Sequence, residues 1–433
     1  MSEQHEEIHL DVYIDRYELY LETGNKVYRQ GIQNKDTKDR YQKIIDSFTA
    51  GFLDKKYAEL SKANFANLDA GCEEKLRSMV DGVTSEVGRA LVGLTCLQLA
   101  IKCIAPEQNI RLHKGSTSSR SFSWEEGISM RSLDKRFNTP FLRKNGLLKV
   151  NGDGVFMTRS LAENYPYSRL YKAEMRGPFT QWMAIVDAIE ENVLDPNTGL
   201  SYILSLLKNR SDTFIQDSQT VCELLQEFSS DSFEDIKNFI ISFYNETHYS
   251  ARAFEISIHA LYQAMDELNL LEGRKLIAIS QMRSANKKHG NVGDIELMED
   301  GMIVTAWDAK YGKPYLREEL DELREKLLQH PEVRKAGFIC NSDIDLREDI
   351  CKRKKEIADE TGTEIEIIEF DKFIDAEIVN LESAHRQKLG FRWLTALVES
   401  FAQRRLEIAP IDEPCDAWVT DLIERMLTAK SIR

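Results

Sequence analysis

Three charged residues, Asp294, Asp308 and Lys310, belong to a predicted β-hairpin. Asp300-Gly301 predicts the tight turn, because glycine tolerates the positive φ that a two-residue turn requires. The second arm, Met302 to Lys310, is rich in the β-branched and aromatic residues that strands favour. Side chains two apart in a strand share a face, so Asp308 and Lys310 do, and Asp294 falls roughly opposite this end of the arm. Two carboxylates and an ammonium group are therefore expected to meet at one edge of the hairpin.

This combination of residues indicates phosphodiester chemistry. Neighbouring carboxylates raise each other's pKa, and a divalent cation relieves their repulsion. Hard cations such as Mg²⁺ prefer carboxylate oxygens, water and substrate phosphate. A nearby lysine can orient the attacking water and offset charge that develops on the phosphate. We therefore expect Asp294 and Asp308 to bind Mg²⁺ and Lys310 to assist hydrolysis. An ordinary surface hairpin would explain the charges, but not Asp308 and Lys310 inside a strand.

Asp294 followed by Asp308-Ala309-Lys310 resembles the active-site signature of the PD-(D/E)XK nuclease superfamily, which includes most type II restriction endonucleases. Gly293 stands where that family often has proline. The elements predicted after the hairpin alternate as in the family's common core: a helix Arg317 to Leu328, a strand Ala336 to Cys340, a helix Leu346 to Glu360 and a strand Glu364 to Phe370. The resemblance implies a restriction-endonuclease-like α/β/α core in the C-terminal half, Mg²⁺ as cofactor and double-stranded DNA as substrate.

Two more acidic residues lie near the signature. In the superfamily, a helix before the catalytic strands often donates a further carboxylate, and the helix predicted over Ala251 to Leu268 carries Glu255. The resemblance implies that Glu255 is an accessory catalytic residue and metal ligand, with a structural glutamate as the open alternative. Glu296, two residues beyond Asp294 on the same strand face, is either a residue that supports the metal ligands from behind, a further ligand, or a surface residue.

A basic, glycine-containing stretch leads into Asp294. It includes Asn286, Lys287 and Lys288, whose position suits contact with the scissile phosphate or its neighbours. A flexible solvated loop is the alternative reading. We expect these three residues to bind DNA.

Residues 111–176 reverse the charge of the chain. They carry thirteen basic and six acidic residues, a net charge of +7 in a protein whose net charge is −15. Glycine, serine and turn residues predict loops and short strands there. Arginine beside small hydroxyl residues suits phosphate contact and the reading of guanine edges. A solvated, loop-rich subdomain is the alternative, but the charge reversal favours a DNA-reading surface, with Arg120, Arg131 and Arg136 as candidate contacts.

The length of 433 residues suggests two or three domains, and the expected class is mixed α/β. We predict five regions. They are a helical N-terminal region, 1–110, with helices from Val12 to Tyr28, Asp36 to Phe52 and Glu73 to Ile104; a basic, loop-rich DNA-recognition segment inserted after it, 111–177; a helical connecting region, 178–250; the nuclease core, 251–375; and a helical C-terminal extension, 376–433. The apolar stripe of that extension either covers the core or forms a dimer face.

Composition excludes several other classes. The seven cysteines form no CxxC pair or Cys/His cluster, so disulfides and structural zinc are not expected and a reducing cytoplasm fits. No signal peptide is evident, and no apolar run is long enough for a membrane span. The sequence contains no internal repeat, Walker A loop or dinucleotide fingerprint.

Together these observations predict a cytoplasmic, Mg²⁺-dependent, sequence-specific double-stranded DNA endonuclease of the type II restriction class. The resemblance implies a homodimer and a cognate DNA methyltransferase in the same host as a functional partner. Two alternatives remain open: a repair or mobile-element nuclease on the same core, and a DNA-binding protein with a decayed nuclease core. A phosphoesterase for small molecules fits less well, since a small substrate needs no extended basic surface.

Overall fold

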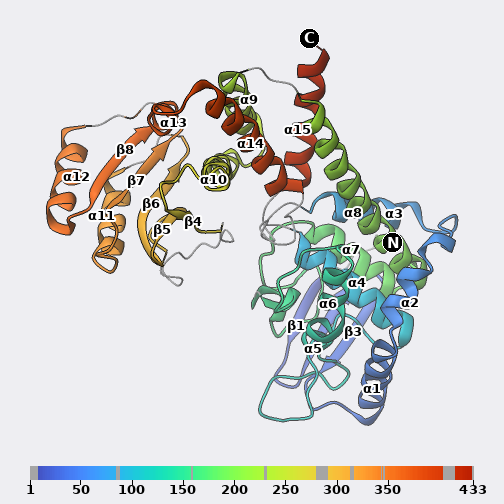
Figure 1. Ribbon diagram of the computed structural model, residues 1–433. Helices are drawn as coiled ribbons and strands as arrows, with labels where there is room; N and C mark the ends of the chain where they lie inside the picture. Colours follow the sequence, from blue (N-terminus) through green and yellow to red (C-terminus); the bar gives the residue numbers. More distant parts are fainter. Residues whose placement is uncertain are drawn as a thin grey trace, which may run out of the picture. The chain divides into compact units, whose positions relative to one another are not determined.

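A computed structural model describes residues 8–83, 88–157, 159–228, 232–278, 291–312, 316–342, 344, 347–402 and 415–431. The chain is mixed α/β, as expected, and it divides into two compact units, Met1–Thr213 and Phe214–Arg433 (Figure 1). Each unit contains one β-sheet. The division falls inside the long helix α8 (Pro196–Glu227).

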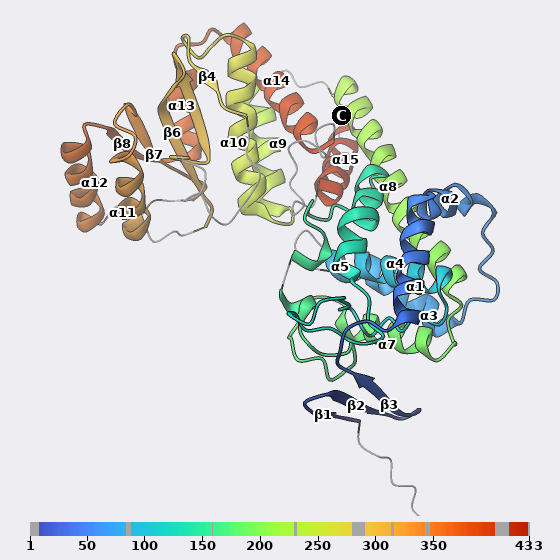
Figure 2. The same cartoon turned by 90° about the horizontal axis from the view of Figure 1, so that it is seen from below.

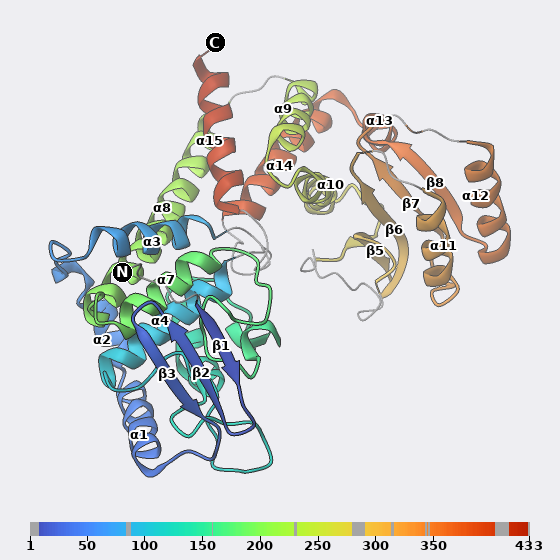
Figure 3. The ribbon, with the colours of Figure 1, turned by 180° about the vertical axis from the view of Figure 1, so that it is seen from behind.

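The first unit begins with an antiparallel sheet of three strands, β1 (His9–Val12), β2 (Arg16–Leu21) and β3 (Gly24–Arg29) (Figure 3). The helix expected from Val12 to Tyr28 is therefore wrong. Burial in β2 alternates with a period of two, since Tyr17 and Leu19 are buried and their neighbours are less so. The ring of Tyr17 packs edge-on against the buried Trp124, 4.9 Å between centroids. This contact with a distant segment favours the strand.

Most helices of the first unit lie outside residues 111–176 and surround one apolar core. They are α1 (Lys35–Thr49), α2 (Phe52–Ala58), α3 (Ala70–Asp81), α4 (Arg89–Ile104), α7 (Phe179–Glu190) and the first part of α8. The single helix expected from Glu73 to Ile104 is two helices, and Gly88, at φ +90°, precedes the second. The apolar α4 is buried on nearly all sides. The connecting region predicted as helical begins with α7 and continues in the long helix α8.

Residues 111–176 contain only short elements, as predicted, but in the described residues these are helical turns, so the expected short strands are wrong. The elements are α5 (Met130–Leu133), a π-helical turn (Asp134–Asn138), α6 (Thr139–Lys144) and two 3₁₀ turns (Val155–Met157 and Arg159–Ala162). A buried carboxylate organises part of this segment, because Asp134 accepts hydrogen bonds from Asn138, Thr139 and the amide of Val155. No strand forms among the described residues of this segment, where β-pairing is limited to the bridge between Gln30 and Trp124.

The second unit is built on a five-stranded sheet in the order β4 (Lys275–Leu276), β5 (Ile295–Glu299), β6 (Met302–Lys310), β7 (Lys335–Cys340) and β8 (Glu364–Glu369). Strands β4, β5 and β6 pair antiparallel, and β6, β7 and β8 pair parallel. The predicted hairpin is confirmed: Asp300 and Gly301 have φ values of 51° and 82°, as a two-residue turn of this type requires.

Helices cover both faces of this sheet (Figure 2). Helices α11 (Leu316–Leu327) and α12 (Glu348–Thr361) pack on the face that carries Ala306, whereas α10 (Ser250–Glu267) and α13 (Phe370–Ile378) pack on the face that carries Trp307. Consecutive residues of β6 thus serve opposite layers. Further helices, α9 (Phe233–Glu246), α14 (Ser383–Ala402) and α15 (Cys415–Ser431), extend the α10 layer. The helix and strand succession expected from 251 to 370 is confirmed.

The apolar stripe of α14 is buried within the second unit. Leu394 and Leu397 belong to its core, and the indole nitrogen of Trp393 donates a hydrogen bond to the carbonyl of Ser257 on α10, at 2.8 Å. The stripe therefore covers the α10 layer, one of its two expected roles. In the described part of the chain, no helix has the length and apolar character needed to cross a membrane.

Candidate active site

Two reciprocal hydrogen bonds join Asp294 to Asp308 and its neighbour Ala309, so that the carboxylate on each side accepts from a backbone amide of the other. Because Ile295 pairs with Trp307, the residue before β5 lies beside Asp308 of β6. The amide of Asp294 donates to Oδ1 of Asp308, and the amide of Ala309 donates to Oδ2 of Asp294, each at 3.1 Å. In each carboxylate, one oxygen accepts one of these hydrogen bonds. The second oxygen takes no part in this reciprocal exchange. The hairpin places the two carboxylates together, as its sequence predicted.

Lys310, the last residue of β6, completes this group. Its Nζ lies 3.8 Å from Oδ2 of Asp308 and 2.5 Å from Oε2 of Glu319. It also lies 5.4 Å from the centre of the Phe338 ring on the neighbouring strand β7. The sequence did not single out Glu319, which stands in the first turn of α11 beside the equally acidic Glu318. Acidic residues commonly occupy that position because they favour the helix dipole, so neither residue stood out.

The electrostatics of the pair follow from burial and crowding. Burial, followed by the nearby charge of Glu255, raises the pKa of Asp294 to about 7. Burial, followed by the charge of Asp294, raises the pKa of Asp308 to about 7. Burial opposes the charge of Lys310, but Asp308 and Glu319 outweigh it and raise the pKa of this ammonium group. Lys310 is therefore a cation and hydrogen-bond donor near neutral pH, whereas the paired carboxylates favour a counter-ion or a proton.

Glu255 lies on α10, close enough to Asp294 to influence its pKa. Its Oε1 accepts a hydrogen bond from the guanidinium group of Arg252, one turn earlier and almost fully buried. The structure therefore brings Glu255 to the edge of the pair but also gives it a cationic partner. Its role as a metal ligand stays a prediction.

Glu296 takes a supporting position next to Asp294, one of the roles expected for it. It is 5% exposed, so the surface alternative is wrong, and its Oε1 accepts hydrogen bonds from the amides of Val292 (2.6 Å) and Gly293 (3.2 Å). It therefore clamps the backbone that leads into Asp294. Gly293 has no room for a side chain, because a Cβ there would lie 2.8 Å from the carbonyl oxygen of Trp307. This close approach accounts for the glycine at position 293, where the family that the sequence resembles often has proline.

The pair fits a hard divalent cation. Among the described residues, no three His, Cys, Asp or Glu side chains are grouped closely enough to form a protein-only metal cage. Mg²⁺ does not need one, since it commonly binds one or two carboxylates and completes its octahedron with water and substrate phosphate. The two carboxylates repel each other, Asp308 is buried and Asp294 is partly buried, and each has an oxygen outside the reciprocal exchange, so the pair meets that requirement.

The three predicted DNA contacts in the basic segment are exposed. They differ in what their side chains already bind. Arg131 donates to the carbonyl of Phe156, and Arg136 lies over the ring of Phe137, with its guanidinium carbon 4.9 Å from the ring centre. The other three predicted contacts, Asn286, Lys287 and Lys288, lie outside the described residues.

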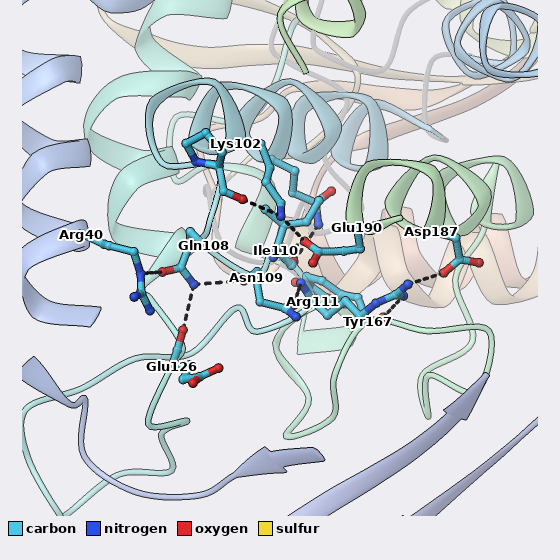
Figure 4. A network of polar contacts seen from close by, with 12 residues as sticks. Arg40, Lys102, Gln108, Asn109, Ile110, Arg111, Glu126, Tyr167, Asp187 and Glu190 are labelled. Carbon is cyan, nitrogen blue, oxygen red and sulfur yellow. Dashed lines mark hydrogen bonds and ion pairs between the residues drawn. The ribbon is translucent and has the colours of Figure 1, made fainter. Parts of the chain in front are cut away.

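Not every basic residue of this segment faces solvent. Arg111 is 2% exposed and belongs to the buried network of Figure 4. It donates to Asp187 at 2.6 Å and to the carbonyl of Tyr167 at 2.9 Å. In the same network, Lys102 pairs with Glu190 at 3.0 Å. Part of the positive charge counted from the sequence therefore stabilises the fold and is not presented to a polyanion.

Comparison with known proteins adds no relative. No protein-family model matches this chain, and no curated protein is significantly similar to it.

Proposed function

We propose that this chain is a Mg²⁺-dependent, sequence-specific double-stranded DNA endonuclease with a restriction-endonuclease-like core of the PD-(D/E)XK type. The observation that carries the proposal is the reciprocal pairing of Asp294 with Asp308, with Lys310 beside them at the end of β6. The antiparallel hairpin that continues into parallel strands between two helical layers supports it. These elements follow one another in the order that was expected from the sequence.

Each residue has a role that its surroundings suit. Asp294 and Asp308 would hold Mg²⁺, with Glu255 as an accessory group at the edge of the site. Bound Mg²⁺ supplies a Lewis acid that lowers the pKa of coordinated water and neutralises phosphate charge. Lys310, protonated near neutral pH, donates hydrogen bonds to the attacking water and to a phosphate oxygen. Glu296 and Gly293 keep the backbone before Asp294 against β6.

The DNA-reading role belongs to the basic segment of the first unit. Arg120, Arg131 and Arg136 are exposed there and suit contact with phosphates and base edges. The restriction reading also implies a homodimer, with one active site for each DNA strand, and a separate methyltransferase that protects the host DNA.

The test is incubation of the wild type and Asp308→Ala with unmethylated phage DNA, with Mg²⁺ or with EDTA. Asp359→Ala is the matched control, because Asp359 is an exposed carboxylate on α12. Discrete fragments from the wild type and the control, only with Mg²⁺, are expected, and sequencing of their ends identifies the site. Random degradation would favour the repair or mobile-element alternative. DNA binding without cleavage by the wild type would favour a decayed nuclease core.

A further inference from the structure

We propose that Glu319 is a positioning residue that holds the Lys310 ammonium group beside Asp308 without letting it bind that carboxylate directly. This inference rests on the proposed nuclease function and deepens it. Glu319 does not contact the substrate in this view. It acts through Lys310.

The distances distinguish the two carboxylates. The Lys310 nitrogen is 2.5 Å from Glu319, which is a short charge-assisted hydrogen bond, and 3.8 Å from Asp308, which is an ion pair without direct hydrogen bonding. The ring of Phe338 lies on a third side, at 5.4 Å. The lysine side chain is only 17% exposed. The ammonium group is thus confined by three neighbours, of which Glu319 is the tightest.

The position of Glu319 is fixed by the core. Leu316, Leu320, Leu323 and Leu327 of α11 are all buried and belong to the apolar cluster that contains Ala306 and Phe338. Their spacing of three and four residues makes one continuous face toward the sheet. Glu319 directly precedes Leu320, at the margin of this face, and its side chain is 36% exposed. The packing that docks α11 on the sheet therefore also sets the distance from Glu319 to the end of β6.

Without Glu319, the nearest remaining carboxylate for Lys310 is Asp308. Its Oδ2 lies outside the reciprocal exchange with Asp294, so it is an oxygen that the proposed Mg²⁺ site would use. A lysine that collapsed onto this oxygen would compete with the cation and would leave the position from which it can reach a phosphate. Glu319 prevents both effects by providing a better-placed partner. Preorganisation of this kind reduces the reorganisation needed when substrate binds.

The test compares Glu319→Ala, Glu319→Gln and the control Glu318→Ala in the full-length protein. Glu318 is the adjacent, exposed carboxylate of the same helical turn. Single-turnover cleavage is measured across a Mg²⁺ series. We expect Glu319→Ala to cleave about 100-fold more slowly, because misplacing a reacting group by about 1 Å can lower the rate by that factor. We also expect this variant to need more Mg²⁺ for its half-maximal rate. Glu319→Gln keeps an acceptor oxygen at the same reach and should recover part of the rate. Glu318→Ala should match the wild type.

A second readout does not depend on cleavage. Thermal unfolding is measured for Lys310→Met, Glu319→Ala and the double variant, in EDTA. If Glu319 holds Lys310, the drop in midpoint of the double variant is smaller than the sum of the two single drops. Additive drops, or a Glu319→Ala variant that cleaves like the wild type, overturn the proposal. If the wild type cuts no DNA, the nuclease proposal fails by itself, and the unfolding cycle still decides whether Glu319 positions Lys310.

Discussion

The backbone amide of Asp294 donates to the side chain of Asp308. The Asp308 carboxylate, a proposed metal ligand, therefore also holds the backbone at Asp294, the other proposed ligand. Asp308→Asn keeps an acceptor oxygen for this amide and removes a buried negative charge beside Asp294. Asp308→Ala removes the acceptor as well, and an unsatisfied buried amide costs about 1–3 kcal/mol. At pH 8 in EDTA, we expect Asp308→Asn to unfold at a higher temperature than the wild type, and Asp308→Ala at a lower temperature than Asp308→Asn. An Asn variant less stable than the Ala variant would contradict this account of the pair.

Magnesium should stabilise the folded wild type. A ligand that binds only the native state adds about 2.7 kcal/mol when its concentration is 100 times its Kd. We therefore expect Mg²⁺ to raise the unfolding midpoint of the wild type and of Asp359→Asn, and to leave that of Asp308→Asn nearly unchanged. Calorimetric or fluorescence-detected unfolding measures the shift. An equal shift in all three proteins would place the bound cation away from Asp308.

Glu296 should matter more for the backbone than for the metal. Its Oε1 satisfies the amides of Val292 and Gly293, so Glu296→Ala leaves two amide groups without this acceptor. At about 1–3 kcal/mol for each unsatisfied group, urea unfolding should show a clear loss of stability, together with slower cleavage. Glu296→Gln retains an acceptor oxygen and should lose much less of both. If the two variants cleave equally slowly at full stability, the negative charge of Glu296 is what the reaction needs.

Two arginines of the basic segment should behave in opposite ways. Arg120→Ala removes an exposed charge, so we expect weaker DNA binding, a salt dependence reduced by about one phosphate contact, and unchanged stability. Arg111→Ala leaves Asp187 with only the more exposed Arg169, at 3.5 Å, and should destabilise the first unit by up to about 3–5 kcal/mol. Binding of labelled duplexes at several salt concentrations, with urea unfolding, separates the two. A salt dependence unchanged by Arg120→Ala would remove it from the DNA contacts.

His113 should make the first unit sensitive to acid. Its ring is buried, stacks on Tyr167 and donates from Nε2 to the carbonyl of Glu163 at 2.7 Å. Burial, followed by the charge of Lys114, lowers its pKa to about 3. Below about pH 6.5, the unfolded chain binds a proton that the folded chain refuses, so stability falls by up to about 1.4 kcal/mol per pH unit as pH decreases. The stability lost between pH 7.5 and pH 5 should be smaller in His113→Gln. Equal losses in urea unfolding would assign the acid sensitivity to other groups.

Local signals in the sequence were enough for most elements of the second unit, though not for α13, which begins where the last strand was expected to end. The hairpin follows from Asp300-Gly301, where both residues have positive φ, and its register brings Asp294 beside Asp308 without help from distant segments. The buried leucines of α11 recur at three- and four-residue spacing, burial in β8 alternates, and β7 is a short apolar run that is buried almost throughout. The expected pairing of two carboxylates with a lysine was therefore available from the sequence, because pairing within a hairpin is a local interaction.

Prediction from the sequence failed where the apolar residues of one segment fitted both the helical and the strand spacing. Residues 12–28 place apolar side chains at helical spacing, yet they form strands, because alternate residues such as Tyr17 and Leu19 pack with Trp124, about a hundred positions away along the chain. The charged groups present the same difficulty. Only tertiary structure distinguishes Glu319 from Glu318, buries Arg111 while Arg120 stays exposed, and turns Glu296 toward two backbone amides. The sequence by itself determined which groups can do the chemistry; packing of distant segments decided which of them meet, since a side chain's partners depend on how helices dock on the sheet.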